Sequence, residues 1–189
     1  MLVATTHRAI VGGVETYLRA VLPLLAERGI ELGLLTAFGP TPGQGDILDG
    51  CPGVSAWVND LAAVAAFRPD VVFTHDLPDA GMDAALAERY PTVRFAHNYA
   101  GMCVSGTKYH AAPGRQACSR RLGPGCLAAY FPRRCGGLNP VSTLRLYGEN
   151  RTRQATLGRL RSVLVASRHM AAEVIRNGAP ADRVKVVPL

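Results

Sequence analysis

Short apolar runs alternate along this chain with longer stretches in which apolar residues recur every three or four positions. The short runs are typical of strands buried in a parallel sheet, and the longer stretches are typical of amphipathic helices. We expect strands at residues 2–5, 31–36, 54–58, 70–74, 93–96, 162–166 and 184–187. Helices are expected from Val14 to Arg28-Gly29, over 60–67, 79–89 and 142–160, and from Ser167 to Asn177-Gly178. Since strands and helices alternate from end to end, the sequence predicts an α/β domain with an open parallel sheet and helices on both faces.

One segment breaks this pattern. Between about residues 98 and 141 the chain has no regular periodicity and is rich in cysteine and arginine. Such a length is unusual for a connection inside a compact domain. We expect an irregular loop insertion that serves a function or holds a metal.

A glycine pair, Gly12-Gly13, stands between the first strand and the first helix. Glycine lets the backbone come close to a ligand, and the first turn of a helix presents free N–H groups at the positive end of its dipole. This arrangement suits a bound anion. It also suits a turn that only packs tightly, and the turn by itself does not separate the two interpretations.

Several polar residues fall at the expected carboxyl ends of strands, where open α/β sheets bind their ligands. These are His75, His97 with the adjacent Asn98, and Ser167. Together with the glycine pair they predict one shared cleft. Ser167 also fits the N-cap of the helix that follows it. Glu15 is explained by the helix dipole, and we do not assign it as a base.

The 189 residues carry a net charge of +7, with Lys108 and Lys185 as the only lysines. Arginines gather in the irregular segment and in the helix after it, at positions 115, 120, 121, 133, 134, 145, 151, 153, 159 and 161. A solvated face with ion pairs to another lobe explains this cluster most simply. A patch for anionic lipid headgroups or a lipid diphosphate ranks next, and nucleic acid is unlikely because aromatic residues are few and no recognised module is present. With no apolar stretch that could span a bilayer and no signal peptide pattern, we expect a cytoplasmic chain, with membrane association at the inner face as a second option.

Four of the five cysteines, Cys103, Cys118, Cys126 and Cys135, lie in the irregular segment. In a cytoplasmic protein such a group is more often a metal site than a disulfide framework, and His110 is a substitute ligand. The group contains no CxxC pair, which zinc sites usually have. A structural zinc, disulfide or redox pairing, and ordinary free thiols therefore all stay open. Cys51 lies apart from the group.

Four stretches in order resemble family 4 glycosyltransferases: GGVETYLRAVLPLLAERGIELGLLT, RPDVVFTHD, VRFAHNYAGMC and SVLVASRHMAAEVIRNGAPADRVKVVPL. The resemblance implies a GT-B enzyme with two Rossmann-like lobes, of which residues 1–189 form the amino-terminal, acceptor-side lobe. The donor-binding lobe has no counterpart in the chain. The family's nucleotide-sugar donor and its glycan or lipid-linked acceptor then become the expected partners.

The resemblance also implies roles for individual residues in a retaining transfer of a hexose-type sugar. The backbone at Gly12, Gly13 and Val14 would lie against the donor diphosphate, and His97 would contact the donor sugar. Their positions at strand ends make His75, Asn98 and Ser167 further candidates for substrate binding. For His75 a structural hydrogen-bonding role is equally open, and the alternative for His97 is a partly buried histidine that only fixes the loop after it. No cofactor or metal is expected in catalysis, because protein groups stabilise the leaving group in this fold.

Three other functions compete with this one. A Rossmann-like binding module with a zinc-stabilised basic loop and a sugar-nucleotide epimerase on the same fold both remain alternatives. An NAD-dependent dehydrogenase is disfavoured, because the first turn lacks G-x-G-x-x-G and the second strand ends without an acidic residue.

Overall fold

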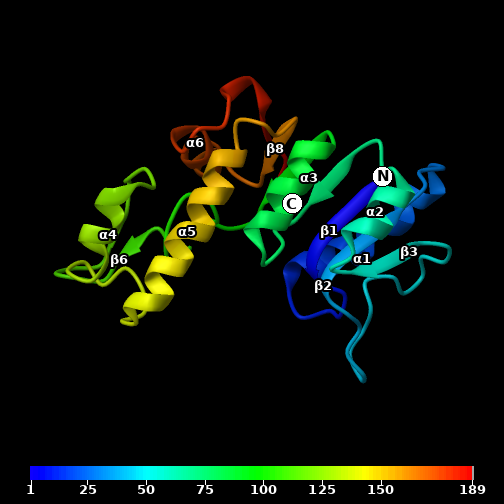
Figure 1. Ribbon diagram of the computed structural model, residues 1–189, viewed down its shortest axis with the longest axis horizontal. Coiled ribbons are helices and arrows are strands. Elements are labelled where there is room, and N and C mark those ends of the chain that lie inside the picture. Colours follow the sequence, from blue (N-terminus) through cyan, green and yellow to red (C-terminus); the bar gives the residue numbers. More distant parts are fainter. Residues whose placement is uncertain (189) are drawn as a thin grey trace.

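The computed structural model describes residues 1–188, and its main feature is a seven-stranded parallel sheet (Figure 1). The strand order is β3-β2-β1-β4-β5-β8-β9. The strands are β1 (Leu2–His7), β2 (Gly33–Phe38), β3 (Ser55–Val58), β4 (Val72–Thr74), β5 (Thr92–Ala96), β8 (Ser162–Val165) and β9 (Val184–Val186). All seven match strands expected from the apolar runs, so the predicted open parallel sheet is confirmed.

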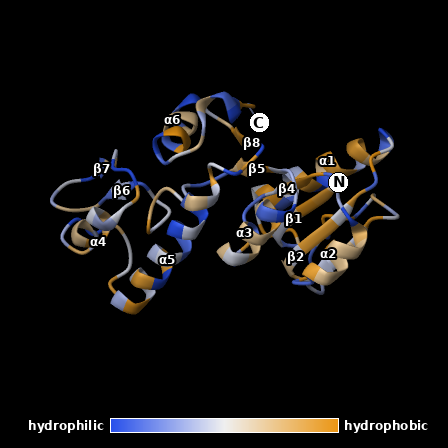
Figure 2. Ribbon diagram, turned by 45° about the horizontal axis from the view of Figure 1, so that its top comes forward, coloured by the Kyte–Doolittle hydropathy of each residue, from blue (hydrophilic) through white to orange (hydrophobic). Residues whose placement is uncertain are grey.

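Helices cover both faces of this sheet, as the alternation predicted. They are α1 (Gly13–Glu27), α2 (Leu61–Phe67), α3 (Ala80–Arg89), α5 (Pro140–Thr156) and α6 (Arg168–Arg176), with a short 3-10 turn at Ala181–Arg183. Neighbouring residues of β1 point to opposite faces. Val3 packs in a cluster with Leu18 and Leu22 of α1, whereas Leu2 packs with Val64 of α2 and Leu86 of α3. Figure 2 shows β1 and β2 as hydrophobic strands in this part of the molecule.

The segment at 98–141 leaves the sheet and forms a small lobe beside α5 (Figure 1). It is more regular than the sequence suggested. It contains an antiparallel pair, β6 (Tyr109–His110) with β7 (Gln116–Ala117), and the helix α4 (Pro124–Tyr130). Their short length explains why no periodicity was visible. The apolar cluster of this lobe is small, and its buried members are Val104, Leu122 and Tyr130.

A buried ion pair ties this small lobe to the rest of the fold. Lys108 Nζ lies 2.7 Å from Glu173 Oε2 on α6, and each side chain is only 4% exposed. The lysine also donates to the carbonyl of Arg120. Truncating one member of such a pair leaves a buried charge without its partner, so the pair fixes where the lobe sits.

The helix α5 begins earlier than expected, at Pro140 rather than near Ser142, and ends at Thr156 rather than 160. The side chain of Asn139 caps it by accepting from the N–H groups of Val141 and Ser142, and proline is favoured at the first helical position. Within residues 1–188, the structure shows no helix that is both long enough and apolar enough to cross a membrane.

Candidate functional site

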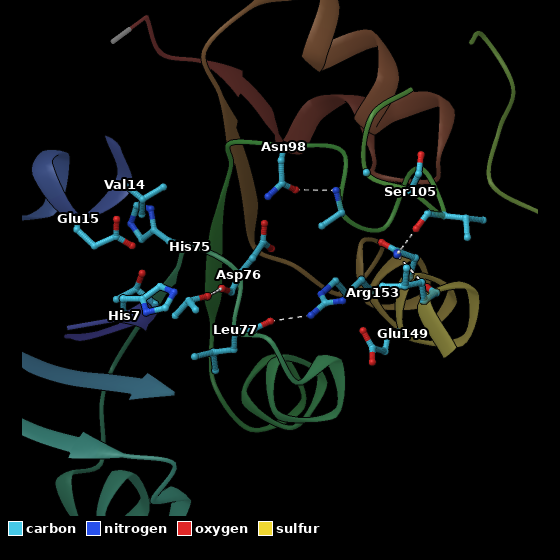
Figure 3. Close-up of a pocket in the computed structure, with 17 residues that line it drawn as sticks. His7, Val14, Glu15, His75, Asp76, Leu77, Asn98, Ser105, Glu149 and Arg153 are labelled. Carbon is cyan, nitrogen blue, oxygen red and sulfur yellow. Dashed lines mark hydrogen bonds between the residues drawn. The ribbon is translucent and has the colours of Figure 1, made fainter. Parts of the chain in front are cut away.

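A cleft of about 490 Å³ opens at the carboxyl edge of the sheet, where β1, β4 and β5 end and α1 begins. Figure 3 shows Val14, Glu15 and His7 on one side of it, and Ser105, Glu149 and Arg153 on the other. The small lobe and α5 therefore supply the second wall. The described lining residues are Thr5, Thr6, His7, Val14, Glu15, His75, Asp76, Leu77, Asn98, Ala100, Val104, Ser105, Gly106, Leu146, Glu149, Asn150 and Arg153.

The glycine pair lies at the start of α1, next to Val14 in the cleft wall. Gly12 is the N-cap residue, and no described side chain caps this helix end, in contrast to α2, α3, α5 and α6. Gly12 has an extended backbone (φ −166°, ψ −166°) that any residue adopts. Among the described residues, a Cβ at Gly12 would meet its nearest atom, Glu15 Oε2, at 3.4 Å, and a Cβ at Gly13 would meet nothing within 4 Å. Packing inside the described chain therefore does not require glycine at either position.

Two histidines from adjacent strand ends form a direct pair. His75 Nδ1 lies 2.8 Å from His97 Nε2, and the rings stack with centroids 5.0 Å apart. His75 Nε2 is buried and has no hydrogen-bond partner among the described residues. An orphaned buried N–H is rarer than an orphaned acceptor, so we assign the proton of His75 to Nδ1, which donates to His97. His97 then carries its own proton on Nδ1.

Both histidines are held neutral near pH 7. Burial, and secondarily the charge of His97, lowers the pKa of His75 from 6.5 to about 3. Burial also lowers the pKa of His97, against the opposing effects of Asp76 and Glu15 and with a smaller contribution from Arg94. A neutral pair can present hydrogen-bond donors and acceptors to a polyhydroxylated ligand without a net charge.

Stability should fall in acid because of His75. The unfolded chain takes up a proton at His75 below pH 6.5, whereas the folded chain resists protonation down to about pH 3. The unfolded state therefore binds more protons in this window, and this group lowers the free energy of unfolding by up to about 1.4 kcal/mol per pH unit as the pH falls. Asp83 acts in the opposite direction, because its pKa is raised from 3.8 to about 6 and its protonation favours the folded state.

The measurement is urea unfolding between pH 7.5 and 4.5 for the wild type and His75→Gln. Asp83 is present in both proteins, so the difference between their curves isolates the histidine. We expect a flatter pH profile for His75→Gln, and an unchanged profile for the control His169→Gln, at an exposed position on α6. Parallel profiles for wild type and His75→Gln would contradict the assignment.

The residue after His75 belongs to a second polar group. Asp76 has a left-handed backbone (φ 65°) and its Oδ1 lies 2.7 Å from Arg94 Nε. The Arg94 guanidinium also donates to the carbonyl of Ala100 at 2.9 Å. Arg94, on β5, thus connects Asp76 at the end of β4 to the loop after β5, and so fixes the floor between the two cleft walls.

A third polar group is centred on Arg153, which the sequence pattern did not mark as part of a site. Arg153 of α5 donates from Nη2 to the carbonyls of Leu77 and Pro78 at 2.6 and 2.7 Å, and its Nε lies 3.7 Å from Asp83 Oδ2. Asp83 accepts from Thr74 Oγ1 at 3.0 Å. Burial first, then the charge of Asp76, raises the pKa of Asp83, while Arg94, Arg153 and the Thr74 hydroxyl oppose the rise. Arg153 thus holds the loop that carries His75 and Asp76.

The structure gathers some of the predicted residues and not others. Val14, His75 and Asn98 line the cleft, and Gly12 and Gly13 adjoin it. His97 is next to His75 and is not one of the described lining residues.

Ser167 is exposed and caps α6, with Oγ accepting from Met170 N at 3.2 Å, so its N-cap role is confirmed. The cleft wall also includes Glu15, which is only 5% exposed, although its position suggested a dipole role alone.

The model of the family described as Glycosyltransferase Family 4 matches residues 11–189. The chain belongs to glycosyltransferase family 4. No curated protein sequence matches it. The cleft is thus the cleft of a glycosyltransferase-family domain.

Solved structures agree on the fold. The chain is similar to Anabaena Alr3699/HepE in complex with UDP (14% identity, TM-score 0.53) and to the same protein with UDP and glucose (14%, 0.55). It is also similar to a glycosyltransferase from Rickettsia africae (9%, 0.53). Each match covers 99% of this chain and 43%, 43% and 42% of the other. The chain therefore spans less than half the length of these structures.

Proposed function

We propose that this chain is the acceptor-side lobe of a retaining glycosyltransferase that moves a hexose-type sugar from a nucleotide-sugar donor. The observation that carries the proposal is the glycine pair. Gly12 and Gly13 stand where neither backbone conformation nor packing within the described chain requires glycine, at the start of a long helix that lies beside the cleft. A ligand that approaches the backbone closely gives a reason for both.

The chemistry of that ligand follows from the helix end. Loss of a nucleoside diphosphate builds negative charge on phosphate oxygens, which backbone N–H groups stabilise. The N–H groups of Gly13 and Val14 have no intrahelical acceptor, because they belong to the first turn of α1. Glu15 follows Val14 directly, and its carboxylate would repel the diphosphate. The diphosphate would therefore lie on the glycine side of the turn. The UDP in complex with the Anabaena protein supports this class of donor.

The histidine pair would contact the donor sugar. With the single proton of His97 on Nδ1, its imidazole would donate a hydrogen bond to a sugar oxygen while His75 holds the ring from the other side. Both pKa values are lowered, so the pair would add no positive charge that competes with the departing diphosphate. Catalysis by backbone dipoles and neutral side chains is consistent with a transfer that needs no cofactor.

The acceptor is proposed to be a glycan, either free or linked to lipid. An exposed apolar group on the small lobe and α5 supports the lipid-linked form. Leu138 and Val141 are each 74% exposed and Leu144 is 60% exposed, and the exposed Arg134 and Arg145 are near them in the sequence. Apolar side chains flanked by arginines suit contact with an anionic bilayer surface.

The test is turnover of nucleotide-sugars by the complete translation product that contains residues 1–189. A panel of uridine, guanosine, adenosine and thymidine diphosphate hexoses is assayed for release of the nucleoside diphosphate. Release from one donor, with retention at the anomeric carbon by NMR, is expected. Failure of every donor would overturn the proposal and favour the binding module. Co-sedimentation with anionic but not neutral vesicles tests the membrane contact, and transfer to a lipid-linked rather than a free glycan decides the acceptor.

A further inference from the structure

The small lobe brings four of the five cysteines around one void. Cys103, Cys118, Cys126 and Cys135 all line a cavity of about 20 Å³, and all four are free thiols. A space of this size has room for one small ion or one water molecule. The fifth cysteine, Cys51, is buried elsewhere, in the apolar cluster under α1.

Local spacing does not explain the gathering, because the four cysteines come from different elements. Cys103 lies in the loop after β5, Cys118 directly follows β7, Cys126 is inside α4, and Cys135 follows that helix. The tertiary fold of the lobe is what makes them converge.

The lobe also has little other stabilisation of its own. The buried residues of its apolar cluster are Val104, Leu122 and Tyr130. A segment of about forty residues with so small a core generally needs a cross-link or a metal to hold one conformation. Cys126 and Cys135 pack directly against this cluster, so a metal there would tie the loops to the core.

We propose that Cys103, Cys118, Cys126 and Cys135 bind one structural zinc ion as four thiolates, and that the lobe closes on the metal. Within residues 1–188, no three His, Cys, Asp or Glu side chains are arranged as a metal site as they stand. Rotation about the Cα–Cβ bond reorients each thiol beside the shared void. Such rotations, with small loop shifts, would bring the thiols to zinc–sulfur distances of about 2.3 Å.

The surroundings suit a thiolate site. Binding replaces four S–H protons by one Zn²⁺, so up to four protons are released and the centre carries a charge of −2. Arg120 lines the same void and offsets part of that charge. His110 Nδ1 lies 3.3 Å from Cys135 Sγ, where an N–H donated to the sulfur would orient it. Hydrogen bonds of this kind to ligating groups are common around metal centres.

The experiment starts from the chain purified in reducing buffer without chelator, with zinc measured by mass spectrometry. About one zinc per chain is expected. Cys118→Ser and Cys126→Ser should retain less than about a tenth of it, and the matched control Cys51→Ala should retain all of it. Zinc content does not depend on glycosyl transfer, so this result stands apart from that of the donor assay.

Should the serine variants fail to fold, cobalt titration of the chelator-treated wild type decides. Tetrahedral thiolate coordination gives intense visible bands together with sulfur-to-cobalt charge transfer in the near ultraviolet, saturating at one equivalent. Absence of these bands and of zinc, with five titratable thiols, would overturn the proposal. So would two disulfides found by peptide mapping of the protein kept under reducing conditions.

Discussion

Replacing Gly13 with tryptophan should reduce nucleoside diphosphate release by at least about 100-fold while leaving the fold intact. The indole would occupy the open space beside the first turn of α1, where a Cβ meets no described atom within 4 Å. A donor phosphate could then no longer reach the N–H groups of that turn. Loss of one strong charge-stabilising contact in a transition state costs about 3–4 kcal/mol, which corresponds to the expected decrease in rate.

The matched control is Ala20→Trp, an exposed position two turns further along the same helix. It adds the same side chain to the same element, so activity should stay within about twofold of the wild type. The free energy of unfolding should change by no more than about 1 kcal/mol in either variant, because the helix propensities of glycine, alanine and tryptophan lie within about 1 kcal/mol of one another. Unchanged turnover in Gly13→Trp would place the diphosphate elsewhere.

Much of the fold could be predicted because the two kinds of apolar pattern never overlap. A run such as Val71-Val72-Phe73 has no polar position to face solvent, so it can only be a buried strand or the middle of a buried helix. The Arg68-Pro69 break before it and the short length decide for the strand. Within the sheet, a helix lies between each strand and the next, except that a loop connects β2 to β3. This repeated strand-helix unit gives the parallel order and the position of the carboxyl edge.

Only those residues of the candidate site that closely follow a strand could be predicted from the sequence. His75 and the glycine turn belong to that group. The wall formed by Ser105 and Glu149 does not, because it depends on where the small lobe and α5 pack. The place of Glu15 in the opposite wall was not predicted, because the helix dipole already explained an acidic residue at that position. Side chains in a helix give no sign in the sequence of which distant strand they will meet. Arg153 was for this reason counted in the sequence as one more residue of a basic helix.

Arg153→Met should lower the free energy of unfolding by about 3–5 kcal/mol, the cost of removing one partner of a buried ion pair. The arginine is 7% exposed, and without it the carbonyls of Leu77 and Pro78 lose their donor. Asp83 would also lose a nearby cation in a nearly buried position. The control is Arg159→Met, at an exposed position shortly after α5. It should lower the free energy of unfolding by less than about 0.5 kcal/mol.

The pH dependence separates this account from a simple loss of packing. Arg153 opposes the rise in the pKa of Asp83, so that pKa should move above its value of about 6 in Arg153→Met. A carboxyl whose pKa is raised in the folded state stabilises the fold below the unfolded value and loses that contribution as the pH rises. The loss in free energy of unfolding caused by Arg153→Met should therefore be largest near pH 8 and shrink towards pH 5.

A second change, Asp83→Leu, should recover part of the stability at pH 8, because it removes the charge that lost its partner. A deficit that is constant with pH and unaffected by Asp83→Leu would show that the arginine acts through its packing alone.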